Sequence, residues 1–295
     1  MPGRMSYITT EIGKIVAEGS GFKTDGHVTS SPGFIKQLGK LNLFYGTYGY
    51  TEQDQETGTY RFRKMNAVII NWLKNSNDIF RLQRIATPKQ SGTVGNQADY
   101  IGIPLGPTGA LNNYLETLVS SIGTIQVFKG DATRRMILMS AAEVYFNLAE
   151  AAERGVPGIG TAQANYENGV RWAFRLAAAT HTGTATASVA AADAAADAYL
   201  VNGIANADWS ASPNKLAAIL IQKWVALCHI DGLEAWSDYR KSGGLSIPTS
   251  PKSIVAGASP EPVRIDYPLR ETQTNGENVP TGIDHFTTKI FWDVN

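Results

Sequence analysis

The clearest pattern of apolar and polar positions runs from residue 136 to residue 154. Its apolar side chains recur at the three- and four-residue spacing of one helix face: Ile137, Ala141, Val144, Leu148 and Ala152. Gly155 and Pro157 follow at once, and these two residue types commonly end helices. The pattern therefore predicts a long amphipathic helix over residues 136–154.

Two further helices follow along the chain. Residues 161–178 show the same helical spacing, with small and aromatic side chains on one face. A short turn precedes them and suits an antiparallel helix hairpin. Residues 188–201 are rich in alanine, the residue with the highest helix propensity. We expect the small side chains of these helices to allow close packing.

A fourth helix is predicted over residues 213–230. Ser212 would be its N-cap and Pro213 its first residue, a position where proline is well tolerated. The segment is apolar on nearly every side apart from Gln222 and Lys223. A helix with this pattern is typical of a central, buried position.

The rest of the chain lacks a sustained period. Residues 20–66 and 88–130 are rich in glycine, proline and polar residues, which indicates loops with short strands or helices. Between them, residues 67–74 form a short amphipathic helix by their spacing, and from residue 248 onward the composition favours an extended tail over the helices. The predicted fold is mostly α, with tetratricopeptide-like helix pairs beside a loop-rich, irregular region.

The amino-acid composition limits the kinds of partner that we expect the chain to bind. The 295 residues hold 26 lysines and arginines against 26 aspartates and glutamates, so no overall field favours nucleic acid or anionic lipid. The single cysteine, Cys228, cannot form an internal disulfide and is expected to be a small buried apolar residue. No apolar run is long enough to cross a bilayer, and the first residues lack the apolar stretch of a signal peptide.

Four segments resemble the SusD/RagB family of surface glycan-binding lipoproteins. They are AEVYFNLAEAAERG at 142–155, QKWVAL with GLEAWSDYRKSG at 222–243, RIDYPLRETQTN with a further asparagine at 264–278, and TKIFWD at 288–293. Each segment alone is a weak signal, whereas four in this order are not expected by chance. The resemblance is firm over residues 136–295 and weaker over residues 65–106.

The resemblance implies a function and a domain organisation. Members are non-enzymatic nutrient-binding lipoproteins of the outer-membrane surface, which deliver glycans to a SusC-like TonB-dependent transporter. We expect residues 1–295 to be one SusD-like domain whose N-terminal part is missing. Within it, 1–133 would be loop-rich, 134–245 a paired-helix scaffold and 246–295 an extended tail. The signal and the anchoring cysteine would lie upstream, so that only a missing lipid anchor would reach the membrane.

Binding of a neutral sugar calls for exposed aromatic faces with hydrogen-bonding side chains around them. Aromatic residues that stand among polar residues in the irregular segments are the candidates for ligand binding: Tyr45, Tyr48, Tyr50, Tyr60, Tyr100 and Trp209. The alternative for each one is a ring packed within the domain, because tyrosines that alternate with glycines are also typical of packed strands and loops.

A glycoside hydrolase with a helical fold is the first rival hypothesis. Glu234 and Asp238 are one helical turn apart, and paired carboxylates suggest glycosidase chemistry, although such pairs usually flank a cleft from different elements. We expect them instead to make structural hydrogen bonds, together with Arg240, while Trp236 packs in the core. A helical protein-interaction scaffold that binds no sugar is the other rival.

Other chemistry has little support in the sequence. The histidines have no metal-ligand spacing: His27, His181, His229 and His285. There is no Gly-x-Ser-x-Gly elbow and no glycine-rich phosphate loop. We expect no catalytic residues, no metal ligands and no cofactor, and the sequence leaves open whether a structural calcium is present.

Overall fold

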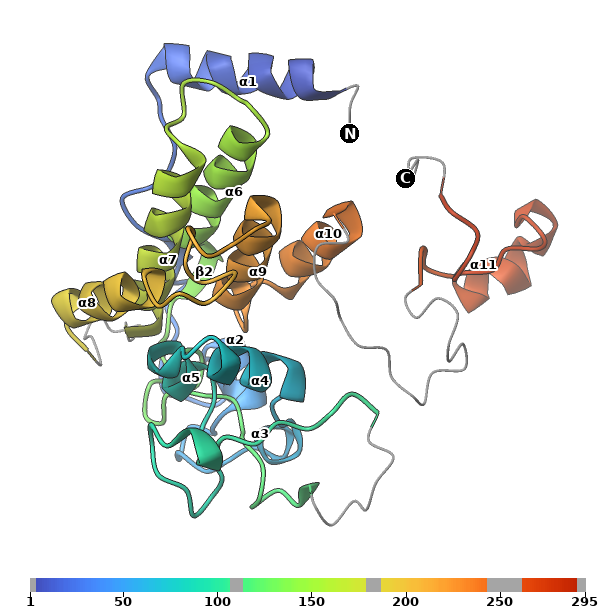
Figure 1. Cartoon of the computed structure of the whole chain (residues 1–295). Helices are drawn as coiled ribbons and strands as arrows, with labels where there is room; N and C mark the ends of the chain where they lie inside the picture. The colour runs from blue at the N-terminus through green and yellow to red at the C-terminus, as the bar shows by residue number, and fades with distance from the viewer. Residues whose placement is uncertain (1–3, 107–113, 179–186, 243–261, 291–295) are drawn as a thin grey trace. The chain divides into compact units, whose positions relative to one another are not determined.

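The computed structural model describes residues 4–106, 114–178, 187–242 and 262–290. The chain divides into two compact units (Figure 1). Unit 1 comprises Met1–Ile103 and Tyr114–Ser246, and unit 2 comprises Pro104–Asn113 and Ile247–Asn295. Among the described helices, none is both long and apolar enough to span a bilayer.

Unit 1 is mostly helical. Its α-helices are α1 (Met5–Glu18), α2 (Leu43–Tyr48), α3 (Gly58–Phe62), α4 (Ala67–Asn75), α5 (Ile79–Ile85), α6 (Ala141–Glu153), α7 (Ala162–Ala178), α8 (Val189–Leu200), α9 (Lys215–Leu227) and α10 (Gly232–Ser242). A 3-10 helix (Gln97–Asp99) and two strands, β1 (Val28–Ser30) and β2 (Met136–Met139), complete its described elements. The prediction of a mostly α fold with paired helices is confirmed.

Helices α6 to α9 form the scaffold. Helix α7 packs against α6 and α8, and α9 packs against α6. Their shared core is built from small and aromatic side chains: Ala142, Phe146, Ala149, Tyr166, Val170, Ala173, Phe174, Ala196, Tyr199 and Ile219. Gly169 of α7 lies directly under the ring of Phe146 of α6, where a Cβ atom would be 2.8 Å from the ring. This glycine therefore permits the close approach of the two helices.

The prediction that the first scaffold helix begins near residue 136 is wrong. Met136–Met139 is strand β2, which pairs antiparallel with β1. The helix begins at Ala141, because the Ser140 hydroxyl accepts a hydrogen bond of 3.0 Å from the Glu143 N–H and caps it. A continuous apolar run does not distinguish strand from helix, and the capping serine marks the true start.

The start of α9 also differs from its prediction. Asn214 is the N-cap, since its side chain accepts a hydrogen bond of 3.0 Å from the Ala217 N–H. Ser212 and Pro213 therefore lie before the helix. The expected burial of α9 is correct, and it includes the two polar exceptions: Gln222 and Lys223 are as buried as their apolar neighbours.

A second core lies under the loop-rich region. Helices α4 and α5 pack on each other, and α5 also packs on α7. Apolar residues from the loop-rich region and from the helical scaffold meet there, including Ile70, Leu73, Leu82, Ile125 and Val225. The loops of unit 1 within residues 20–103 and 114–130 are thus anchored on the helical scaffold, and the predicted helix at 67–74 is confirmed as α4.

Helix α1 was not expected from the sequence. Its side chains Ile8 and Ile12 contact a small cluster that includes Val144 and Leu148 of α6. Figure 1 shows α1 across one end of the α6–α7 pair. The sequence of α1 has only a narrow stripe of apolar residues along one face, and none of its residues is fully buried.

Unit 2 holds little regular structure in its described residues. Helix α11 (Leu269–Thr274) and a 3-10 helix (Gly276–Asn278) are its elements. The guanidinium of Arg264 stacks on the Tyr267 ring, with 5.3 Å between the guanidinium carbon and the ring centroid. The proposed division into 1–133, 134–245 and 246–295 stays a prediction.

Candidate functional site

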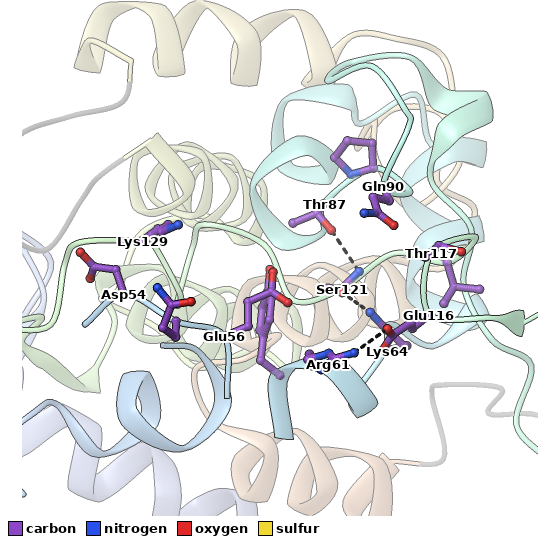
Figure 2. A pocket seen from close by; sticks show the side chains of 14 residues that line it. Asp54, Glu56, Arg61, Lys64, Thr87, Gln90, Glu116, Thr117, Ser121 and Lys129 are labelled. Atoms are coloured by element: carbon purple, nitrogen blue, oxygen red, sulfur yellow. Dashed lines mark hydrogen bonds and ion pairs between the residues drawn. The ribbon is translucent and has the colours of Figure 1, made fainter. Parts of the chain in front are cut away.

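An open pocket of about 700 Å³ lies in the loop-rich part of unit 1 (Figure 2). It is lined mainly by hydroxyl, amide and charged side chains: Asp54, Gln55, Glu56, Tyr60, Arg61, Lys64, Thr87, Pro88, Gln90, Glu116, Thr117, Val119, Ser121 and Lys129. A concave surface with many hydrogen-bonding groups is suited to a polar ligand.

Backbone hydrogen bonds fix one wall of the pocket. The Ser120 carbonyl accepts a hydrogen bond of 2.9 Å from the Met65 N–H. The Ser121 carbonyl accepts one of 3.0 Å from the Thr87 N–H, and the Thr87 hydroxyl in turn accepts one of 3.0 Å from the Ser121 N–H. This pairing holds Lys64, Thr87 and Ser121 in place beside the pocket (Figure 2).

Helix α3 brings Tyr60 to the pocket. The Thr57 hydroxyl accepts a hydrogen bond of 3.1 Å from the Tyr60 N–H and so caps this short helix. The Tyr60 ring lies 5.3 Å from that of Tyr50, which in turn lies 5.9 Å from Tyr45, measured between ring centroids. Burial raises the pKa of the Tyr60 hydroxyl, so it stays protonated. Three of the six candidate residues are thus brought together.

Three of the six charged side chains that line the pocket form ion pairs. Arg61 Nη2 lies 2.9 Å from Glu116 Oε1, and Lys36 Nζ lies 2.5 Å from Asp54 Oδ2. These cations lower the pKa of Glu116 and Asp54. Both carboxylates therefore remain ionised and engaged at neutral pH.

The expectation that the candidate aromatic rings stand exposed is wrong for three of them. Tyr45 and Tyr100 are 0% exposed and Tyr60 is 6% exposed. Their hydroxyls have partners within the protein: Tyr45 accepts a hydrogen bond of 3.1 Å from the Gly130 N–H, and Tyr100 accepts one of 3.3 Å from the Gly95 N–H. These rings are core residues with polar tips. Ligand binding by them stays a prediction.

The other three candidates are half-buried. Tyr50 lies beside the pocket through its contact with Tyr60. Tyr48 has the Arg63 guanidinium over its ring, 5.2 Å from the centroid. Trp209 lies elsewhere, because its ring packs 5.1 Å from Tyr166 in the scaffold core. The structure therefore does not bring Trp209 to the pocket.

Most of the pocket residues carry no signal that sequence reasoning could use. Lys64, Thr87, Gln90 and Ser121 lie in irregular segments and belong to no recognisable motif. They converge only through pairing between distant segments, such as the bridge between Lys64 and Ser121.

Glu234 and Asp238 of α10 have a structural role. The Lys223 ammonium lies 2.8 Å from Glu234 Oε1 and 2.7 Å from Asp238 Oδ2, and it also donates a hydrogen bond of 2.8 Å to Asn147 Oδ1. Neither carboxylate lines the pocket of Figure 2. Trp236 was expected in the core, but its side chain is 39% exposed and contacts Tyr239 at the surface.

In the described part of the chain, no group of three or more histidine, cysteine or acidic residues is arranged to hold a metal ion. His27 accepts a hydrogen bond of 3.1 Å from the Ala141 N–H at the start of α6. His229 lies near the end of α9, and His285 lies 3.2 Å from Asp266 in unit 2. His181 lies outside the described residues.

Several solved structures share this fold. A SusD homologue from Bacteroides fragilis is 22% identical, with a TM-score of 0.67 over 90% of this chain and 57% of its own. Another from Bacteroides vulgatus is 21% identical, with a TM-score of 0.67 over 97% of this chain and 58% of its own. A chitin-binding SusD homologue from Flavobacterium johnsoniae is 27% identical, with a TM-score of 0.58 over 79% of this chain and 50% of its own.

The chain thus spans between 50% and 58% of the length of these solved relatives. A search of curated proteins finds no match to the sequence. A family model described as "starch-binding associating with outer membrane" matches residues 42–268, which include α2 to α10 and the whole pocket. The chain therefore belongs to the SusD-like family of that description.

Proposed function

We propose that the pocket of unit 1 binds an oligosaccharide and that the chain does not cleave it. The observation that carries this proposal is the lining of the pocket, which combines hydroxyl, amide and charged groups around an open space of about 700 Å³. The family description and the chitin-binding relative from Flavobacterium johnsoniae support the same ligand class. The engagement of Glu234 and Asp238 with Lys223 supports binding without hydrolysis.

The chemistry of the pocket predicts modest affinity. Each sugar hydroxyl exchanges hydrogen bonds with water for hydrogen bonds with side chains such as Gln90 and Thr117, and the net gain from each exchange is small. Tyr50 and Tyr60 would add apolar contact at one end, because a small part of the cluster remains accessible. Specificity would come from the number of such contacts.

We propose further that binding takes place at the outer surface of a bacterial outer membrane. The protein would be held there by a lipid anchor and would deliver its ligand to a SusC-like TonB-dependent transporter. The association with the outer membrane in the family description supports this location. The scaffold helices α6 to α9 would be the surface for the transporter, and the loop-rich face would meet the glycan.

The test is a binding screen against neutral and acidic oligosaccharides by isothermal titration calorimetry. The double variant Gln90→Ala/Thr117→Ala removes two lining side chains that have no partners among the described residues. We expect it to raise the Kd by about thirtyfold, since two hydrogen bonds of roughly 1 kcal/mol each are lost. The control Gln163→Ala, on the surface of α7, leaves the Kd unchanged.

Three outcomes would contradict the proposal. Binding to no glycan in the screen would favour a protein-interaction scaffold. Release of reducing ends by the wild type but not by Glu234→Gln would show a glycoside hydrolase. Glycan binding that persists in the Gln90→Ala/Thr117→Ala variant would place the site outside this pocket.

A further inference from the structure

We propose that the oligosaccharide is acidic and that a sugar carboxylate pairs with the ammonium group of Lys64. This inference rests on the proposed function, because it names the ligand class of the same pocket. Figure 2 shows Lys64 at one side of the pocket, next to Ser121.

Lys64 is a half-buried cation whose contacts are incomplete. Its Nζ donates a hydrogen bond of 2.7 Å to Ser121 Oγ. No carboxylate of the described residues forms an ion pair with it, although an ammonium has three protons to donate. Burial lowers the pKa of Lys64, which reflects the cost of holding its charge away from water. A ligand carboxylate would supply the missing counter-charge.

The neighbouring carboxylates of Glu116 and Glu56 raise the pKa of Lys64 from a distance, but neither forms an ion pair with it. Glu116 lies nearby, but its Oε1 is bound by Arg61 at 2.9 Å. Asp54 is likewise bound by Lys36. Each of these acids therefore has its own cation, and the charge of Lys64 is left facing the pocket.

Lys129 provides a second positive group. It is exposed, and its ammonium lies 5.8 Å from the centroid of the Tyr50 ring rather than on a carboxylate. Figure 2 shows Lys129 and Lys64 on either side of Glu56. Glu56 would repel an acid group from the middle of the pocket and accept hydrogen bonds from sugar hydroxyls there. An acidic sugar is thus directed toward the lysine at one end.

Because Lys64 is half-buried, we expect it to contribute more to the binding affinity than an exposed surface lysine would. A charge-assisted hydrogen bond to a group that is already desolvated is stronger than one between solvated partners. We expect the free acid to bind about ten- to hundredfold more tightly than the same sugar without its charge. High salt would reduce the difference only in part, since partly buried pairs are weakly screened.

The experiment compares matched oligosaccharides by calorimetry. Galacturonate, mannuronate and glucuronate oligomers are each tested with free carboxylates and as methyl esters, alongside neutral glucose and N-acetylglucosamine oligomers. The proteins are the wild type, Lys64→Met, Lys64→Arg and the control Lys14→Met, which removes an exposed charge on α1. Circular dichroism melting confirms that each variant is folded.

We expect at least one free acid to bind tenfold or more tightly than its methyl ester. Lys64→Met abolishes that preference, Lys64→Arg retains most of it, and Lys14→Met leaves it intact. Equal binding of acid and ester, or binding of neutral oligomers alone, overturns the acidic ligand while the proposed function stands. A preference that survives Lys64→Met overturns the role of Lys64. Absence of binding to every oligomer overturns the proposed function, and the inference with it.

Discussion

The side-chain oxygen of Gln222 accepts a hydrogen bond of 2.8 Å from Nη2 of Arg81, which lies 141 positions earlier in the chain. The same carboxamide donates hydrogen bonds of 2.8 Å to the Tyr199 hydroxyl and 2.7 Å to the Asn206 carbonyl. Arg81 also pairs with Asp78, and both side chains are buried. This network joins α5 of the loop-rich region to helices α8 and α9 of the scaffold.

The network makes Gln222 necessary for stability. Gln222→Met preserves the volume but removes three buried hydrogen bonds, one each with Arg81 Nη2, the Tyr199 hydroxyl and the Asn206 carbonyl. We expect the free energy of unfolding to fall by about 2–3 kcal/mol, the cost of unsatisfied buried polar groups. Urea denaturation measures the change. Gln163→Met on the exposed face of α7 is the control, with a change of less than about 0.5 kcal/mol. An equal effect of both substitutions would contradict the role of the network.

The scaffold helices could be predicted because the repeat of their apolar residues can be read within each helix's own segment of sequence. Tyr166 and Val170 of α7 recur at helix spacing and do face the core. The polar residues of α9 are exceptions to its apolar pattern, but their partners lie in other segments of the chain. Lys223 is paired with residues of α10, and Gln222 with Arg81. A local pattern carries no information about such partners.

The pocket could be predicted only in part. Tyr60 was found because it is aromatic, although it is nearly buried. Lys64 and Ser121 were missed because a lysine and a serine in irregular segments resemble any solvated loop. Their 2.7 Å contact depends on a bridge between segments 57 positions apart. Trp209 is the converse case, since its position in a loop carries no sign of its packing on Tyr166, and ligand binding by it stays a prediction.

The buried ammonium of Lys223 supports a second prediction. Lys223→Met removes one of the cations that pair with the buried Asp238 carboxylate and the cation that pairs with Glu234. Lys241 still lies 3.0 Å from Asp238, so we expect a loss of about 1.5–3 kcal/mol in the free energy of unfolding, the worth of a charge-assisted hydrogen bond. Calorimetric melting would show it as a large drop in Tm.

The control for this variant is Lys14→Met. The Lys14 ammonium lies 2.7 Å from Glu11, and both side chains are exposed. Exposed ion pairs contribute between about 0 and 1 kcal/mol, so the Tm should hardly change. A small effect of Lys223→Met, similar to that of the control, would show that α10 does not depend on this contact.

Two glycines give opposite predictions for the same substitution. Gly169→Ala places a Cβ atom 2.8 Å from the Phe146 ring, between α6 and α7, and we expect it to destabilise the fold by about 1–3 kcal/mol. Gly13→Ala, within α1, meets no atom within 4 Å and should stabilise the helix by up to about 1 kcal/mol. Chemical denaturation of both variants tests the pair. Stabilisation by Gly169→Ala would contradict the close packing of α6 on α7.

The pH dependence of stability should report on His229. Its Nε2 atom is buried without a hydrogen-bond partner among the described residues, and burial lowers the pKa of His229 to about 4. The unfolded chain binds the proton near pH 6.5, so protonation favours unfolding. This contribution to stability is complete above pH 6.5 and is lost as the pH falls toward 4. At pH 5 we expect a loss on the order of 2 kcal/mol.

His229→Asn isolates this contribution. His229 has a left-handed backbone with a φ of 64°, which asparagine adopts more readily than most residues, and asparagine does not titrate. Urea denaturation at pH 7.5 and pH 5 gives the loss for each protein. We expect the variant to lose about 2 kcal/mol less than the wild type between these values. Burial also lowers the pKa of His27, so a further loss of the same sign remains in both proteins. Identical pH dependence in the two proteins would show that His229 is accessible to protons in the folded state.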